Sequence, residues 1–252
     1  KDLVVRSLDD KPYRKSPKAP FITSSLQQEA GNKLRLSAGE VMRIAQGLYE
    51  SGYITYMRTD NVGLSDEAIA AIRAEISSTF GDKFVPAEPR TYKSKVKNAQ
   101  EAHEAIRPTL PLRSPDSLRS ELNAVELNVY RLVWQRTLAS QMGDAQGTTL
   151  MVRLGAEAKT AEPADCEFSA SGTTITFPGY RAVYEEVDDE RSDDDTEAIL
   201  PALNVGDNIS VSELTAVGHT TTPPARYTEP TLVKKLEELG IGRPSTYASI
   251  LK

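Results

Sequence analysis

Cysteine and histidine are almost absent from this sequence. The 252 residues include one cysteine, Cys166, and two histidines, His103 and His219. A single cysteine can form neither a disulfide within the chain nor a Cys-x-x-Cys metal pair, and this usage fits a reducing, cytoplasmic setting. His103 has no second histidine or cysteine at ligand spacing, so we expect no metal site in this chain.

Long apolar runs and leader-type segments are also missing. Their absence gives no support to a membrane span or to export through a cleaved leader. The first residue is Lys1 rather than methionine, and it lies inside what reads as a strand at residues 3–5. We therefore expect the chain to be a piece of a longer protein.

The sequence lacks a surplus of basic residues. Its net charge of −6, taken alone, argues against a nucleic-acid partner. However, residues 185–197 hold nine acidic residues and one arginine, so the rest of the chain carries a net charge of +2. Like charges at this density repel one another, and the acidic segment is expected to be a mobile loop without calcium-loop spacing.

Helical periodicity dominates the chain before Gly143. A capping box at Ser37 and Glu40 precedes an apolar stripe, and Gly52 is expected to end that helix in the left-handed conformation. The stripe consists of Val41, Ile44, Ala45 and Leu48. Further helices are expected from Ser24, at residues 66–78, within 114–142 and at 228–239, with another beginning near residue 242.

Beyond Gly143 apolar residues alternate with polar ones. This pattern predicts strands at residues 148–154, 166–170, 173–177 and 209–214, with a tight hairpin at Ser171 and Gly172 joining the middle two. Helices followed by strands predict an α+β fold with two cores.

Two basic segments separate these elements. Residues 11–20 form a connector interrupted by prolines, which suits a solvated linker or a cationic strip along a phosphate backbone. Residues 90–98 place lysines around Tyr92, which suits a solvated loop or a grip on a single strand by charge and stacking.

The stretch from Gly52 to Asp60 contains the most unusual grouping of side chains. Tyr56 precedes Arg58 by two residues and Asp60 by four, which places a weak nucleophile beside a permanent cation. A phenol, with a reference pKa of about 10, attacks poorly without help but leaves more easily than an alkoxide. The grouping therefore suits a reversible phosphotyrosine link, although a half-buried strand explains the local pattern equally well.

A second grouping surrounds His103. This histidine lies between the carboxylates of Glu101 and Glu104, with Arg107 four residues on. It could relay a proton or hydrogen-bond to a phosphate, and a structural histidine is the plain alternative.

Two further polar segments suit nucleic acid. Arg243, Ser245 and Thr246 stand at the start of an expected helix, which suits an anion or a simple capped turn. The helix from Ser24 has a face rich in uncharged polar groups, including Gln27, which suits solvent or nucleic-acid contact.

Four blocks of this sequence together resemble the bacterial type IA DNA topoisomerases, in the same order along the chain. Tyr-Met-Arg-Thr-Asp within residues 52–60 and Glu-Ala-His-Glu-Ala-Ile-Arg-Pro at 101–108 are the most specific, and residues 19–30 and 227–249 supply the others. The resemblance covers nearly the whole chain. Asn61 replaces the serine expected after Asp60.

The resemblance implies roles for individual residues. Tyr56 would form a 5′-phosphotyrosyl bond with one DNA strand, Arg58 would contact the scissile phosphate, and His103 would belong to the same site. The residues expected to contact DNA are Gln27, Thr59, Asp60, Arg107, Arg243, Ser245 and Thr246, of which Arg243 and Thr246 would face the active site from the next domain.

The resemblance also implies the domain organisation. Residues 16–142 would form the helical domain that carries the tyrosine. This domain would be inserted in a β-rich arch made of residues 1–15 and 143–214, and residues 215–252 would begin a further DNA-binding helical domain.

The resemblance implies that half of the active site lies outside this chain. In the family, an N-terminal domain binds Mg²⁺ and faces the tyrosine, and no carboxylate cluster of that kind is evident here outside the acidic loop. We therefore expect the piece alone to be inactive and monomeric, with single-stranded DNA and that N-terminal domain as its partners in the cytoplasm, at the nucleoid.

No P-loop is found and no ATP is expected. A non-catalytic module that binds single-stranded DNA or docks onto a protein is the alternative, while a tyrosine recombinase would need several arginines before a C-terminal tyrosine.

Overall fold

The computed structural model describes residues 2–93, 103–158, 164–184 and 200–251. They form both helices and strands, as the sequence predicts, and they divide into two compact units. The first unit comprises residues 1–15, 145–178 and 188–224, and the second comprises residues 16–144, 179–187 and 225–252. The second unit includes the C-terminal helices, and their expected assignment to a separate domain stays a prediction.

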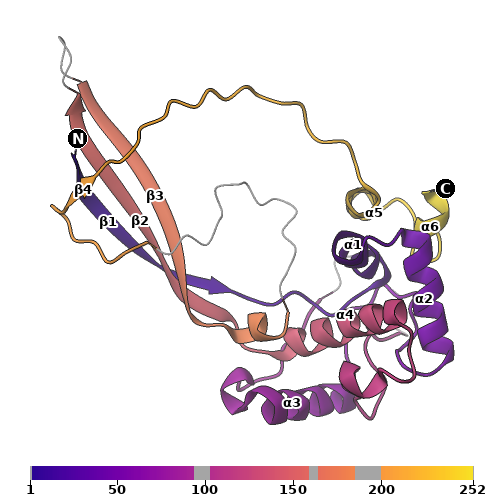
Figure 1. Ribbon diagram of the computed structural model, residues 1–252. Helices are drawn as coiled ribbons and strands as arrows, with labels where there is room; N and C mark the ends of the chain where they lie inside the picture. Colours follow the sequence, from indigo (N-terminus) through magenta and orange to yellow (C-terminus); the bar gives the residue numbers. More distant parts are fainter. Residues whose placement is uncertain (1, 94–102, 159–163, 185–199, 252) are drawn as a thin grey trace. The chain divides into compact units, whose positions relative to one another are not determined.

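The first unit is a four-stranded antiparallel sheet with the order β3-β2-β1-β4. Its long strands are β1 (Asp2–Lys15), β2 (Ala145–Ala158) and β3 (Ala164–Phe177), which twist together in Figure 1, and β4 (Asn208–Ser210) pairs only with the start of β1. The strand expected at residues 209–214 is therefore much shorter than predicted.

The predicted hairpin at Ser171 and Gly172 is wrong. Both residues lie inside the continuous strand β3, where Ser171 pairs with Met151 and Gly172 with Leu150 of β2. The two segments flanking Ser171 and Gly172 do not pair with each other, because β2 is long enough to pair with both of them. The acidic segment 185–197, expected to be a mobile loop, lies wholly outside the described residues.

The connector predicted at residues 11–20 is also wrong for its first half. Strand β1 continues to Lys15, and Pro12 pairs with Thr148 of β2. Proline is tolerated in a strand where the side of the strand that would need its N–H has no partner. Strand β4 covers only residues 2–4 of β1 on that side, so the lack of an N–H at Pro12 breaks no bond to β4.

The second unit is helical. Its helices are α1 (Thr23–Leu34), α2 (Ala38–Glu50), α3 (Asp66–Phe80), α4 (Ala124–Gln141), α5 (Glu229–Glu238) and α6 (Tyr247–Ile250). Short 3-10 turns occur at Asp82–Phe84, Pro115–Leu118 and Gly179–Ala182. Helix α4 is central, because Val129, Val133 and Leu138 are fully buried. In the described part of the chain, every helix is too short or too polar to span a bilayer.

The local signals that begin and end α2 are confirmed. The Ser37 hydroxyl accepts a hydrogen bond from the Glu40 N–H, and the Glu40 carboxylate accepts one from the Ser37 N–H at 2.9 Å. Two residues past the helix end, Gly52 has a φ of 77°, a conformation that glycine adopts at little cost. The chain therefore turns away from α2 immediately before Tyr53.

Candidate active site

Residues 53–60 form an irregular segment after α2. The one regular feature within it is an isolated antiparallel bridge between Ile54 and Pro108, so the alternative of a plain half-buried strand is wrong. Ile54 and Met57 are buried, whereas Tyr56 is half-buried and Arg58 is exposed. The apolar residues therefore anchor the segment and leave the tyrosine and the arginine accessible.

The ring of Tyr56 contacts two other rings. Its centroid is 5.2 Å from that of His103, at an interplanar angle of 43°, and 5.3 Å from that of Tyr49, in an edge-to-face arrangement. Aromatic pairs at these distances contribute about 0.5–1.5 kcal/mol beyond the area they bury. Tyr49, on the last turn of α2, was not predicted as part of this site, because the helix ends at Glu50 and helical spacing therefore says nothing about its contact with Tyr56.

Six of the predicted site residues line one pocket of about 380 Å³. The lining residues are Tyr56, Arg58, Asp60, His103, Arg243, Pro244 and Ser245. They come from three segments that are far apart in the sequence, and all three belong to the second unit. The structure thus brings together the three groupings that the sequence placed at Tyr56, His103 and Arg243.

The pocket favours an anion. Arg58 and Arg243 are exposed, and within the described part of the chain neither guanidinium makes a hydrogen bond or an ion pair. Asp60 is the one carboxylate among the lining residues. Two permanent cations beside a tyrosine hydroxyl are suited to a phosphodiester, because guanidinium groups match the oxygens of a phosphate.

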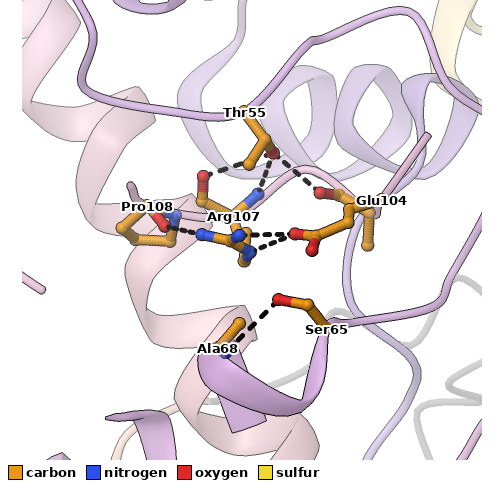
Figure 2. A network of polar contacts seen from close by, with 7 residues as sticks. Thr55, Ser65, Ala68, Glu104, Arg107 and Pro108 are labelled. Carbon is orange, nitrogen blue, oxygen red and sulfur yellow. Dashed lines mark hydrogen bonds and ion pairs between the residues drawn. The ribbon is translucent and has the colours of Figure 1, made fainter. Parts of the chain in front are cut away.

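Arg107 does not line this pocket. The residue is 9% exposed, and its guanidinium donates to Glu104 at 2.5 Å and to the carbonyl of Pro108 at 2.9 Å (Figure 2). Burial alone would raise the pKa of the Glu104 carboxyl, but hydrogen bonds from Arg107 and Ser65 lower it below its ordinary value. Arg107 thus holds the segment after His103 together, and its contact with DNA stays a prediction.

Three other predicted DNA contacts also lie outside the lining of this pocket. Thr59 is buried, and its N–H donates to the hydroxyl of Thr23 at 2.9 Å. The hydroxyl of Thr246 accepts a hydrogen bond from the Arg243 N–H at 2.8 Å. This bond forms the simple capped turn that was the alternative to an anion site. Gln27 is 2% exposed, and neither polar atom of its amide has a partner among the described residues.

The basic run at residues 90–98 is described only as far as residue 93, and the rest lies outside the described residues. In the described part, Arg90 pairs with Asp144 and donates to the carbonyl of Met142 at 2.6 Å. The hydroxyl of Tyr92 donates to the carbonyl of Ser140 at 2.8 Å. These two side chains bind the end of α4 rather than standing ready for a nucleic acid.

The residues present do not fit a metal ion. Among the residues that the structure describes, no group of three His, Cys, Asp or Glu side chains is arranged to hold one. Asp60 is the single carboxylate among the lining residues of the pocket. A hard cation such as Mg²⁺ would need further oxygen ligands from outside this set.

Comparisons with known proteins find similar chains. The family model described as DNA topoisomerase matches residues 1–252. DNA topoisomerase 1 of Mycolicibacterium smegmatis is 54% identical over 254 residues, which cover 99% of this chain and 27% of the relative. DNA topoisomerase 1 of Streptomyces coelicolor is 53% identical over 250 residues, which cover 98% of this chain and 26% of the relative.

A solved structure is similar in fold. The full-length topoisomerase I from Thermotoga maritima matches with a TM-score of 0.77 and 35% sequence identity, over 99% of this chain and 40% of that one. The chain therefore spans about a quarter of the length of these curated relatives and less than half of the solved protein. With its full length matched and its motif residues gathered around one pocket, the chain belongs to the bacterial type IA DNA topoisomerase family.

Proposed function

We propose that this chain supplies the nucleophile of a type IA DNA topoisomerase. The hydroxyl of Tyr56 attacks a backbone phosphate of one DNA strand and becomes joined to the 5′ end of the break. The observation that carries the proposal is the pocket that Tyr56 shares with Arg58, His103 and Arg243. The printed names of the relatives, DNA topoisomerase 1, support the same class of reaction.

The reaction exchanges one phosphoester bond for another. The Tyr56 oxygen bonds to phosphorus, the bond from phosphorus to the 3′ oxygen breaks, and the tyrosine proton is released while the 3′ oxygen gains one. In the return step the 3′ hydroxyl attacks the phosphotyrosine and the phenol leaves. The phosphoester energy is kept in the covalent link, so rejoining the strand requires no ATP.

Arg58 and Arg243 stabilise the negative charge that develops on the phosphate. Negative charge grows on the phosphoryl oxygens as Tyr56 attacks, and preorganised cations at that point lower the barrier to reaction. Arg58 is two residues from Tyr56 in the chain, whereas Arg243 reaches the same pocket from the loop before α6. The reaction therefore depends on both segments being in place.

His103 is assigned to proton transfer or phosphate binding. Its ring lies beside that of Tyr56, and an imidazole can donate or accept a proton near neutral pH. Glu104, the next residue, is held by Arg107, which fixes the backbone that carries His103. Because the ring of His103 contacts the ring of Tyr56, this histidine differs from one that only packs in the core.

The remainder of the reaction is assigned to the rest of the protein. Mg²⁺ and its carboxylate ligands would come from another domain, where the metal would supply charge neutralisation on the phosphate. This chain alone would be inactive and monomeric. Together with that domain it would pass DNA through the break and relax negative supercoils in the cytoplasm.

A relaxation assay tests the proposal. The longer protein that contains this segment is incubated with negatively supercoiled plasmid and Mg²⁺ in the absence of ATP, with the wild-type sequence, Tyr56→Phe and Tyr49→Phe. The phenylalanine at position 56 keeps the ring contacts and removes only the hydroxyl. Relaxation is expected from the wild type and from Tyr49→Phe and is expected to vanish in Tyr56→Phe, whereas equal relaxation by Tyr56→Phe would refute the role of Tyr56.

The alternative, a module that only binds single-stranded DNA or a protein, makes a different prediction. Its affinity for a single-stranded oligonucleotide would be unchanged by Tyr56→Phe, and no strand would be cut even when the remaining domains are present. The described residues 90–93 of the basic run give this alternative no support, because Arg90 and Tyr92 contact the end of α4. Adding the N-terminal metal-binding domain in trans and looking for a cut oligonucleotide separates the two functions.

A further inference from the structure

The backbone around Tyr56 belongs to neither a helix nor a sheet ladder. Regular hydrogen bonding therefore does not fix the position of its hydroxyl. Two threonine side chains hold this segment instead, one contacting it just after Tyr56 and one immediately before it. Neither was identified from the sequence, because each acts on residues far away in the chain.

Thr23 holds the segment on the far side of Tyr56. It is the first residue of α1 and is completely buried. Its hydroxyl lies 2.8 Å from the carbonyl oxygen of Met57, to which it donates, and accepts from the N–H of Thr59 at 2.9 Å. Its own N–H, one of those that a helix start leaves unpaired, donates to the carbonyl of Thr59 at 3.0 Å. Arg58 is thereby bracketed on both sides.

Thr55 holds the segment on the near side. Its hydroxyl donates to the carbonyl of Ala105 at 2.7 Å and accepts from the N–H of Arg107 at 3.0 Å (Figure 2). Its backbone N–H also donates to the carbonyl of Arg107 at 2.9 Å. Ala105 is two residues past His103, so this side chain ties the backbone of Tyr56 to the backbone of His103.

We infer that Thr23 and Thr55 are positioning residues for the Tyr56 nucleophile, and that their hydroxyl groups set the rate at which the phosphotyrosine bond forms. The inference rests on the proposed function. An attacking oxygen displaced by about 1 Å can cost about 10²-fold in rate. Without the hydroxyl of Thr23, the carbonyl of Met57 and the N–H of Thr59 lose their partner in a buried region, and the segment must shift to satisfy them.

The test compares isosteric substitutions in the longer protein that contains this segment. Thr23→Val keeps the shape and removes the hydroxyl, Thr23→Ser keeps the hydroxyl and removes a methyl, and Thr55→Val and Thr55→Ser repeat the comparison. Thr137→Val is the matched control, since Thr137 on α4 is equally buried and its hydroxyl has no partner among the described residues.

One rate and one dissociation constant are measured for each variant. One is the single-turnover rate of covalent bond formation with a labelled single-stranded oligonucleotide. The other is the Kd for the same oligonucleotide in a Tyr56→Phe background, where no bond forms. We expect each valine variant to slow bond formation by about 10- to 100-fold while the Kd changes by less than about 2-fold. The serine variants should recover most of the rate, and Thr137→Val should match the wild type.

Several outcomes would overturn the inference. A valine variant that is folded and forms the bond at the wild-type rate does so, and so does an equal loss in the serine variant, which would indicate packing alone. If Thr23→Val fails to fold in a thermal scan, the half-buried Thr55 pair decides the question. A wild-type protein that forms no covalent bond would instead refute the proposed function, and this result is seen before any threonine variant is compared.

Discussion

Pro230 of α5 lies directly against Gly31 of α1. A Cβ placed on residue 31 would stand 2.4 Å from the Cγ of Pro230, closer than side-chain carbons pack. The hydroxyl of Ser24 also donates to the carboxylate of Glu237 at 2.7 Å. The loop that carries Arg243 follows α5, and α5 is attached to α1 by these two contacts.

Gly31→Ala is therefore expected to loosen α5. Alanine favours a helix over glycine by up to about 1 kcal/mol, but here the added methyl group collides with Pro230. Hydrogen exchange should become faster across residues 229–238 and stay unchanged in α3 and α4. Gly47→Ala in α2 is the matched control, because a Cβ there meets nothing within 4 Å and should only stabilise its helix. Unchanged exchange in α5 of Gly31→Ala would contradict the assigned contact.

The arginines of the site should differ in how they affect the salt dependence of DNA binding. Arg58 and Arg243 are exposed at the pocket, whereas Arg107 is committed to Glu104 and Pro108. Each phosphate contact on a single strand contributes about 0.7 to the slope of log K against log salt concentration. Alanine at position 58 or 243 should lower the slope by about this amount, whereas alanine at 107 should leave it unchanged. A lowered slope for Arg107→Ala would show that Arg107 binds phosphate after all.

A pH-dependent contribution to stability is expected from Glu121. Hydrogen bonds from Arg113 and from the hydroxyl of Tyr53 lower the pKa of this carboxyl to about 2. A lowered pKa stabilises the folded state above the ordinary carboxyl pKa, and this contribution is lost as the pH falls towards 2. The stability advantage of the wild type over Glu121→Gln should therefore be present at pH 6 and shrink below about pH 4.5.

Direct titration checks the cause of that shift. Tyr53→Phe removes one of the donors to Glu121, which lies 2.9 Å from the tyrosine oxygen. The pKa of Glu121, followed by carboxyl NMR, should then rise towards its ordinary value. A pKa that does not respond would leave Arg113 as the sole cause.

Sequence patterns predicted the features that depend on near neighbours. The capping box of Ser37 and Glu40 and the turn at Gly52 lie within a few residues of one another and were predicted correctly. The hairpin at Ser171 and Gly172 was wrong because the choice of partner strand was made elsewhere, in β2. A local pattern carries no information about which distant strand is available.

The candidate site divides in the same way. Tyr56, Arg58 and Asp60 are close in sequence and stand out as a group, and similar groups at His103 and Arg243 point to the same chemistry. Nothing local indicates that Thr23 holds residue 59, 36 positions away, or that Gly31 receives Pro230. The sequence predicts that Arg107 contacts DNA, but its guanidinium is hydrogen-bonded to Glu104. Such pairings depend on the packing of the whole unit.

The central claim is that the oxygen of Tyr56 becomes joined to the 5′ end of a broken DNA strand. The most direct test uses the longer protein with a single-stranded oligonucleotide labelled at its 3′ end or at its 5′ end, followed by denaturation, proteolysis and mass spectrometry of the labelled peptide. The account predicts that only the 3′ label stays with the protein, on a peptide modified at Tyr56. Retention of the 5′ label, or modification of any other residue, would contradict it.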